Sequence, residues 1–323
     1  MKRVFAAVSA GILLIVFLSG CVQSAPKIDR YEKDVLSGFR MVSVSLDRMK
    51  PMSENVCLLT EDVLEDPSYV SAQFAGVFSE DTGETLYVKS PTDKLYPASV
   101  TKCMTALLVL ENVSDLNEKV LVTEEAFSGL TPDASIAFIR AGWTYSVLDL
   151  LYGLLLPSGN EAANALAIHV SGSVKTFVDL MNRRAKELGM MNTHFMNPNG
   201  LHNANHYTTI YDLYLLFRKL IQNETFLAIS GSSGKTVVGE SGTQVETIEY
   251  TNTNSFFRGF TVPPEGMSVV AGKTGYTVQA GRCLILLSVN RAGQRFITVI
   301  AKAPTYDKLY SEMNDLLKIA SGA

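Results

Sequence analysis

The chain has 323 residues, of which 47% are hydrophobic, and its 28 basic residues against 32 acidic residues give a formal net charge of −4. Proteins that bind nucleic acids usually carry a basic patch or stripe, so this slight acidic excess argues against that class of function. The sequence contains no internal repeat and no low-complexity tract.

Residues 1–20 have the features of an export signal. Basic residues at positions 2 and 3 precede an almost wholly apolar run that is short for a transmembrane helix. The run ends in Leu-Ser-Gly-Cys at residues 18–21, which resembles a bacterial lipoprotein box. That resemblance implies cleavage before Cys21, lipidation of this cysteine and stable anchoring to a membrane. Plain secretion and a retained helix are the alternatives.

Residues 21–65 mix charges with prolines and serines and show no clear periodicity. We therefore expect a spacer here, followed by a folded region over residues 66–323. Besides Cys21 the chain has Cys57, Cys103 and Cys283, an odd number that cannot all pair within one exported chain. We expect Cys103 and Cys283 to be small buried hydrophobic residues.

Regular patterns begin near residue 71. Two short apolar runs, residues 72–78 and 85–88, flank the turn sequence of residues 80–83 and predict a β-hairpin. Helical patterns follow at residues 99–112, 146–155, 160–170, 174–188 and 208–222. The last third predicts strands and then a final helix, at residues 243–250, 267–273, 282–289, 295–302 and 306–319.

This order of elements predicts a fold of the α/β (α+β) class. Strands at both ends with helices between them suggest an antiparallel sheet flanked by helices. The intervening helices, at about residues 113–240, then form an inserted all-helical subdomain. After residue 302 the sequence has room for one helix, so we expect neither a further β-rich C-terminal domain nor a C-terminal membrane helix.

Ser99 and Lys102 form the first candidate pair for chemistry. A serine hydroxyl is a poor nucleophile at neutral pH and needs a base within hydrogen-bond reach. Residues three apart share one face of a helix, so Lys102 can reach Ser99 if Ser99 opens a helix. The lysine must be neutral to act as a base, and burial or a nearby like charge such as Lys273 lowers a lysine pKa. Because Ser-x-x-Lys recurs by chance in most chains of this length, the pair alone is better explained as a capped helix with a surface lysine.

A second short motif, Ser158-Gly159-Asn160, lies on a turn between two helical patterns. There Ser158 could pass a proton between Lys102 and a leaving group, and Asn160 could bind a substrate amide. A turn that only caps a helix explains the same residues, so this motif decides nothing by itself.

The third motif, Lys273-Thr274-Gly275, ends an apolar stretch that predicts a strand. Lys273 and Thr274 could hold a substrate carboxylate, while Gly275 would let a substrate backbone approach the strand closely. A phosphate-binding loop would need a glycine at position 267, which is methionine. Nucleotide binding is therefore disfavoured.

The histidines give no clear metal site. His202 and His206 have a spacing that can hold a metal on a helix, but glycine and asparagine around them indicate a loop. No carboxylate or cysteine pattern completes a metal site, so a hydrogen-bonded structural role is expected. No Gly-x-Ser-x-Gly sequence supports a Ser-His-Asp triad.

Together the three motifs match the signature of penicillin-binding proteins and class A β-lactamases, which is Ser-x-x-Lys, Ser-Asp-Asn and Lys-Thr-Gly. The second motif differs from it at Gly159, which points away from the class A β-lactamases. The chain resembles the serine-type D-alanyl-D-alanine carboxypeptidases, the low-molecular-mass penicillin-binding proteins of peptidase family S11. The likeness runs from about residue 70 to 305 and includes residues 96–99, 154–163, 181–190, 193–201 and 272–277.

The resemblance implies a role for each motif residue. Ser99 is the nucleophile, Lys102 the general base and Ser158 the proton relay. Lys273 and Thr274 anchor the substrate carboxylate. The backbone N–H groups of Ser99 and Tyr276 form an oxyanion hole, which stabilises charge that appears only in the transition state.

The resemblance also implies an activity. Such an enzyme removes the terminal D-alanine from peptidoglycan stem peptides through a Ser99 acyl-enzyme, needs no cofactor or metal, and is acylated by β-lactam antibiotics. It acts outside the cytoplasm in cell-wall synthesis and cell-shape control, with the lipid on Cys21 as its membrane anchor.

Three alternatives remain at this stage. A class A β-lactamase uses a glutamate to drive water onto the acyl-enzyme, but residues 192–200 contain none, so penicillin should stay bound. A non-catalytic wall-binding protein would not need the Ser99–Lys102 pair. Endopeptidase or transpeptidase activity shares the acyl-enzyme and differs only in the substrate or acceptor.

Overall fold

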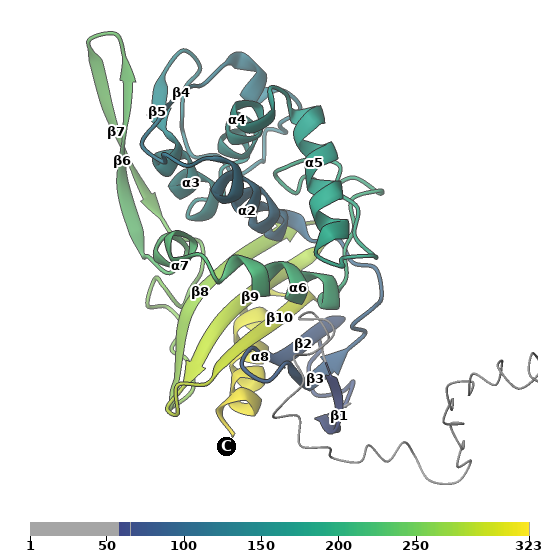
Figure 1. The fold of residues 1–323 in the computed structure, drawn as a ribbon. Coiled ribbons are helices and arrows are strands. Elements are labelled where there is room, and N and C mark those ends of the chain that lie inside the picture. Colours follow the sequence, from purple (N-terminus) through teal and green to yellow (C-terminus); the bar gives the residue numbers. More distant parts are fainter. Residues whose placement is uncertain (1–57, 65, 323) are drawn as a thin grey trace, which may run out of the picture. The chain divides into compact units, whose positions relative to one another are not determined.

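The computed structural model describes residues 58–64 and 66–322. A six-stranded sheet has the strand order β1-β3-β2-β10-β9-β8 (Figure 1). Its neighbours are antiparallel except for β1, which pairs with β3 in parallel. The strands are β1 (Leu58–Leu64), β2 (Phe74–Ser79), β3 (Glu84–Lys89), β8 (Met267–Thr277), β9 (Gly281–Asn290) and β10 (Arg295–Ala303).

The central strands β9 and β10 are covered on both faces, and their alternate apolar side chains enter different hydrophobic clusters. On β9, Leu284 and Leu286 pack with helix α8 (Tyr306–Ser321). Ile285 and Leu287 belong to the larger cluster on the other face, which includes helices α2 (Lys102–Asn112) and α6 (Ile210–Leu220). Successive side chains of a strand point to opposite faces of the sheet. Because both faces of β9 are covered, its sequence is a continuous apolar run rather than an alternation of apolar and polar residues.

The remaining helices lie between β3 and β8 in the sequence (Figure 1). Several begin at a side-chain cap: Ser146 accepts from the Asp149 N–H, Ser173 from the Thr176 N–H and Thr209 from the Asp212 N–H. Such caps satisfy amide groups that a helix start leaves free. These elements are η1 (Ala98–Thr101), η2 (Glu124–Phe127), α3 (Val147–Leu155), α4 (Asn160–Ser171), α5 (Val174–Glu187) and α7 (Glu224–Ser230).

The predicted all-helical subdomain is wrong in one respect, because this region also holds a four-stranded sheet. Its strands are β4 (Lys119–Leu121), β5 (Thr144–Ser146), β6 (Gly234–Ser241) and β7 (Gln244–Thr251), in that order. Two of them are only three residues long, and the β6–β7 hairpin is largely exposed. Short and polar strands leave little hydrophobic periodicity to detect.

The predicted spacer also ends too late. Strand β1 lies inside residues 21–65 and pairs with β3, so the folded region begins before residue 66. Cys21, Cys57 and the predicted signal at residues 1–20 lie outside the described residues. None of the helices in the described part of the chain has the length and apolar character needed to cross a bilayer.

Candidate active site

The candidate nucleophile lies on a tight turn that leads into helix α2. Ser99 is in the short 3₁₀ helix η1, and Lys102 begins α2 directly after it. The Lys102 Nζ is 3.1 Å from Ser99 Oγ, as the spacing of three residues predicted. Ala98 has a φ of +47°, a left-handed conformation that costs a non-glycine residue about 1–2 kcal/mol. The turn is thus held in a strained conformation by its surroundings.

Lys102 is completely buried and has three polar neighbours. Besides Ser99, its Nζ lies 2.7 Å from Asn160 Oδ1 and 2.7 Å from the Asn199 carbonyl oxygen. Burial, followed by the charge of Lys273, lowers the pKa of Lys102 well below its ordinary value, and Glu161 opposes the shift. The sequence prediction of a depressed lysine pKa is therefore supported by the packing around it.

Ser158 and Lys273 form a second pair. The Lys273 Nζ donates to Ser158 Oγ at 3.0 Å and to the Thr274 carbonyl oxygen at 2.9 Å. Lys273 is 1% exposed, and burial lowers its pKa to about 8. The described contact of Ser158 is thus with Lys273 rather than Lys102, and the Lys273 ammonium group is engaged inside the protein rather than facing a substrate carboxylate.

Gly275 allows strand β8 to lie close to the turn that carries Ser99. A Cβ at this position would lie 3.0 Å from the Pro97 carbonyl oxygen and 3.1 Å from the Ser99 nitrogen, closer than most Cβ contacts in proteins. The sequence predicted that Gly275 admits a substrate backbone, but the close neighbour in the structure is the turn that carries Ser99. On the same strand, the Thr274 hydroxyl hydrogen-bonds with that of Thr253 at 2.7 Å.

The segment of residues 192–207 supports the lysine from the other side. Its Asn199 carbonyl accepts the Lys102 hydrogen bond, and the Pro198 carbonyl accepts from Thr105 Oγ1 at 2.6 Å. His206 is buried, its Nε2 lies 2.8 Å from Thr101 Oγ1, and its Nδ1 accepts from the Met196 N–H at 3.2 Å. The predicted structural role of this histidine is confirmed.

Glu161 is a buried carboxylate that the sequence did not single out. Its Oε1 accepts from the Ala137 N–H at 2.5 Å, and the neighbouring Asn160 N–H donates to the Ser135 carbonyl at 2.9 Å. Burial raises the pKa of Glu161. These two bonds fix residues 135–137 against the start of α4. The sequence signal that could have identified Glu161 is its position directly after the Ser-Gly-Asn turn, at the start of an apolar helix.

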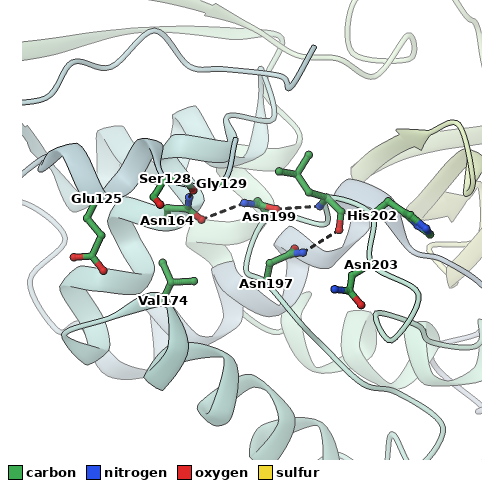
Figure 2. A pocket seen from close by; sticks show the side chains of 10 residues that line it. Glu125, Ser128, Gly129, Asn164, Val174, Asn197, Asn199, His202 and Asn203 are labelled. Carbon is green, nitrogen blue, oxygen red and sulfur yellow. Dashed lines mark hydrogen bonds between the residues drawn. The ribbon is translucent and has the colours of Figure 1, made fainter. Parts of the chain in front are cut away.

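A cavity of about 730 Å³ opens over these groups and is lined by Ser99, Ser158, Asn160, Thr274 and Gly275, among others. A second cavity of about 310 Å³ adjoins it and shares Gly129, Leu201 and His202. Figure 2 shows this second cavity, where the Asn199 amide donates to Asn164 Oδ1 and the Asn197 amide to the Leu201 carbonyl. Both cavities therefore border the segment that supports Lys102.

Cys103 and Cys283 are free thiols and both are buried, as predicted. Within residues 58–64 and 66–322, no three side chains of the metal-binding types lie close enough together to hold a metal ion.

Comparisons with known proteins identify the family of this chain. A family model described as D-alanyl-D-alanine carboxypeptidase, peptidase S11, matches residues 61–305. The chain belongs to this family. It is 32% identical over 253 residues to the D-alanyl-D-alanine carboxypeptidase DacF of Bacillus subtilis, covering 77% of this chain and 62% of DacF. It therefore spans less than two thirds of that S11 relative.

Two further similarities are to an endopeptidase and to a transpeptidase. A D-alanyl-D-alanine endopeptidase of Pseudomonas aeruginosa is 31% identical over 228 residues, which cover 70% of each chain. The crystal structure of the Streptomyces K15 DD-transpeptidase matches with a TM-score of 0.73 at 28% identity, covering 79% of this chain and 98% of that one. The predicted penicillin-binding fold is thereby confirmed.

Proposed function

We propose that this chain is a serine D-Ala-D-Ala carboxypeptidase that removes the terminal D-alanine of peptidoglycan stem peptides. One observation carries the proposal: the buried Lys102 amine lies 3.1 Å from the Ser99 hydroxyl at the floor of an open cavity. Membership of the S11 family supports the substrate class.

The contacts of Lys102 suit a neutral amine. A neutral amine has two N–H donors and one lone pair. Two of its three neighbours, Asn160 Oδ1 and the Asn199 carbonyl, can only accept, so they take the two N–H bonds. In the structure the Lys102 Nζ donates to Ser99 Oγ; once the amine is neutral, its lone pair faces this third neighbour and can accept the hydroxyl proton. These contacts support Lys102 as the general base.

These positions support the following reaction. Ser99 Oγ attacks the carbonyl carbon of the D-Ala–D-Ala bond while its proton moves to Lys102. The carbonyl oxygen gains negative charge and is stabilised by the backbone N–H groups of Ser99 and Tyr276. The proton that Lys102 received passes through Ser158, which Lys273 orients at 3.0 Å, to the leaving amine as the C–N bond breaks. D-Alanine departs, and water then hydrolyses the ester to regenerate Ser99.

Two measurements test the proposal. Purified protein should release D-alanine from a D-Ala-D-Ala pentapeptide, and labelled penicillin should block this release while attaching covalently. The Ser99→Ala variant should neither release D-alanine nor take up label. Covalent labelling of that variant would show that Ser99 is not the nucleophile, and absence of D-alanine release from the unchanged protein would refute the activity.

We expect penicillin to remain bound rather than to be turned over. No glutamate occurs in residues 192–200, the segment beside Lys102. Rapid catalytic hydrolysis of penicillin would favour a β-lactamase instead. Because one relative is a D-alanyl-D-alanine endopeptidase, a cross-linked peptide dimer should be assayed beside the pentapeptide. Release of monomers from that dimer would show that the protein has endopeptidase activity as well as carboxypeptidase activity.

We also propose that the chain works outside the cytoplasm, held to a membrane by a lipid on Cys21. The sequence Leu-Ser-Gly-Cys at residues 18–21, after an apolar run, supports this location, and a cell-wall substrate requires it. Radiolabelled palmitate should enter the full chain and not its Cys21→Ala variant. Equal labelling of the two would exclude Cys21 as the anchor.

A further inference from the structure

The second cavity adjoins the catalytic cavity and is lined by none of the residues of the three motifs. Its volume of about 310 Å³ is at the lower end of the range for small-molecule sites. The two cavities share Gly129, Leu201 and His202. A substrate that is bound at Ser99 can therefore extend past these shared residues into the second cavity.

Two buried asparagines hold the walls of the second cavity together. The Asn164 Nδ2 donates to the Ala126 carbonyl at 2.9 Å, and its Oδ1 accepts from Asn199 Nδ2 at 3.1 Å (Figure 2). Asn199 Oδ1 in turn accepts from the Leu201 N–H at 3.0 Å. These bonds join η2 to the segment of residues 192–207, so the cavity is formed before any ligand enters it.

Glu125 gives the second cavity a negative charge. Among the described residues that line it, Glu125 is the only carboxylate, and none is a lysine or an arginine. Its side chain is exposed and belongs to none of the ion pairs that the described residues form. The Ser128 hydroxyl, a further possible acceptor, lines the same cavity (Figure 2). These groups favour a cation and repel an anion.

Val174 and Leu201 add apolar surface to the same cavity. Both side chains are half-buried and line it together with Glu125. An aliphatic amine has an apolar stem and a charged end, so it can contact such side chains while its ammonium group reaches a carboxylate. The lining therefore fits an aliphatic chain that ends in an ammonium group.

The length of the substrate on each side of the attacked bond decides which part can enter. On the leaving side, a D-Ala-D-Ala peptide has a single residue, which ends in a carboxylate that Glu125 would repel. On the acyl side the peptide continues. Only the acyl side can therefore supply a further side chain with a positive charge.

We propose that the second cavity binds the side chain of the residue that precedes D-Ala-D-Ala, and that this side chain is an aliphatic amine whose ammonium group pairs with Glu125. The inference rests on the proposed function, because it places the D-Ala-D-Ala bond at Ser99. Glu125 is then a specificity-determining residue, which makes the enzyme prefer peptides whose amine is free.

The test compares two acetylated peptides, in which lysine or norleucine precedes D-Ala-D-Ala. Norleucine keeps the four side-chain carbons of lysine and lacks the ammonium group. The unchanged protein should show a kcat/KM about 3- to 10-fold higher for the lysine peptide, a modest factor because Glu125 is exposed to solvent. Glu125→Gln should abolish this preference and leave kcat/KM for the norleucine peptide unchanged.

Glu124→Gln is the matched control for net charge. Glu124 is the neighbouring residue in η2, is also exposed, and lines neither cavity. This variant should keep the full preference for the lysine peptide. Loss of the preference in Glu124→Gln as well would show that general charge attraction, rather than a pair with Glu125, causes it.

A second variant tests the cavity itself. Val174→Phe places a larger side chain in the second cavity, which Val174 lines, and Val174 does not line the catalytic cavity. It should lower kcat/KM for the lysine and norleucine peptides and spare a peptide with alanine at that position. Equal rates with all three peptides in the variant and the unchanged protein would show that the side chain lies elsewhere.

The remaining outcomes separate this inference from the proposed function. If the unchanged protein releases D-alanine equally well from the lysine and norleucine peptides, or if Glu125→Gln keeps the preference, the inference is wrong and the carboxypeptidase stands. Equal losses with both peptides in Glu125→Gln would show that Glu125 only supports the fold. If the unchanged protein releases no D-alanine from any of the peptides, the proposed function fails and this inference fails with it.

Discussion

Replacement of Gly200 by alanine should disable the site through the backbone. Gly200 has a φ of +89°, and a Cβ built on it would lie 2.0 Å from the Ala98 carbonyl oxygen and 2.9 Å from the Ser99 nitrogen. A normal C···O contact is about 3.3 Å, so one of the two segments must move by roughly 1.3 Å. Both segments contact the proposed catalytic pair, because the Asn199 carbonyl accepts from Lys102 and Ala98 precedes Ser99.

The magnitude has two parts. The left-handed backbone should cost about 1–2 kcal/mol once a Cβ is present, and overpacking should add about 1–3 kcal/mol. A misplacement of about 1 Å commonly reduces a reaction rate about 100-fold. Gly200→Ala should therefore lower the free energy of unfolding by about 2–5 kcal/mol and slow acylation by penicillin about 100-fold.

Gly142→Ala is the matched control. Gly142 has a φ of +78°, but a Cβ there would have no atom within 4 Å. The Gly142→Ala variant should lose only the free energy of unfolding that the left-handed backbone costs, as measured in urea. Its rate of acylation by penicillin, measured in a stopped-flow assay, should be unchanged. If Gly200→Ala acylates as fast as Gly142→Ala, the packing of residues 192–207 does not position the catalytic pair, and this reasoning is wrong.

Three further results are expected. Burial lowers the pKa of His206 to about 3, below its ordinary 6.5, so on acidification the unfolded chain binds a proton before the folded protein does. The free energy of unfolding, measured in urea, should therefore fall by about 2 kcal/mol through this group between pH 7 and pH 5. The His206→Gln variant should lack that part of the pH dependence. Glu312 accepts hydrogen bonds from Ser71 and from the Ala72 N–H. Glu312→Gln should therefore lower the free energy of unfolding by about 1–3 kcal/mol and reduce the melting temperature. An unchanged melting temperature would show that these bonds to the carboxylate do not stabilise the fold. Burial raises the pKa of the Cys103 and Cys283 thiols to about 12 and 11, so a thiol reagent should label them only upon unfolding, and rapid labelling of the native protein would contradict their burial.

The sequence predicted the elements with strong periodicity well. The helices that became α3, α4, α5 and α6 and the strands β8, β9 and β10 agree to within a few residues, because caps and apolar runs mark them. It missed strands whose formation depends on a partner elsewhere in the chain. The parallel strand β1 is one example, and the three-residue strands β4 and β5 are others.

The candidate site shows a similar division. The motif spacing correctly brought Ser99 next to Lys102, because that contact is local to one helical turn. The sequence could not predict that the Asn199 carbonyl accepts a hydrogen bond from Lys102, because a backbone acceptor has no side-chain signature. Nor could it show that Lys273 is buried and donates to Ser158, because the packing of β8 decides that.

The central claim is that Lys102 is a neutral base for Ser99, and the pH dependence of acylation by a β-lactam tests it most directly. Burial and the charge of Lys273 lower the pKa of Lys102, so its amine is neutral above that lowered value and protonated below it. The acylation rate constant should rise with pH and reach a plateau well below pH 10.5, with no acylation in Lys102→Ala. A rate that continues to rise toward pH 10.5, as for an ordinary lysine, would contradict the account.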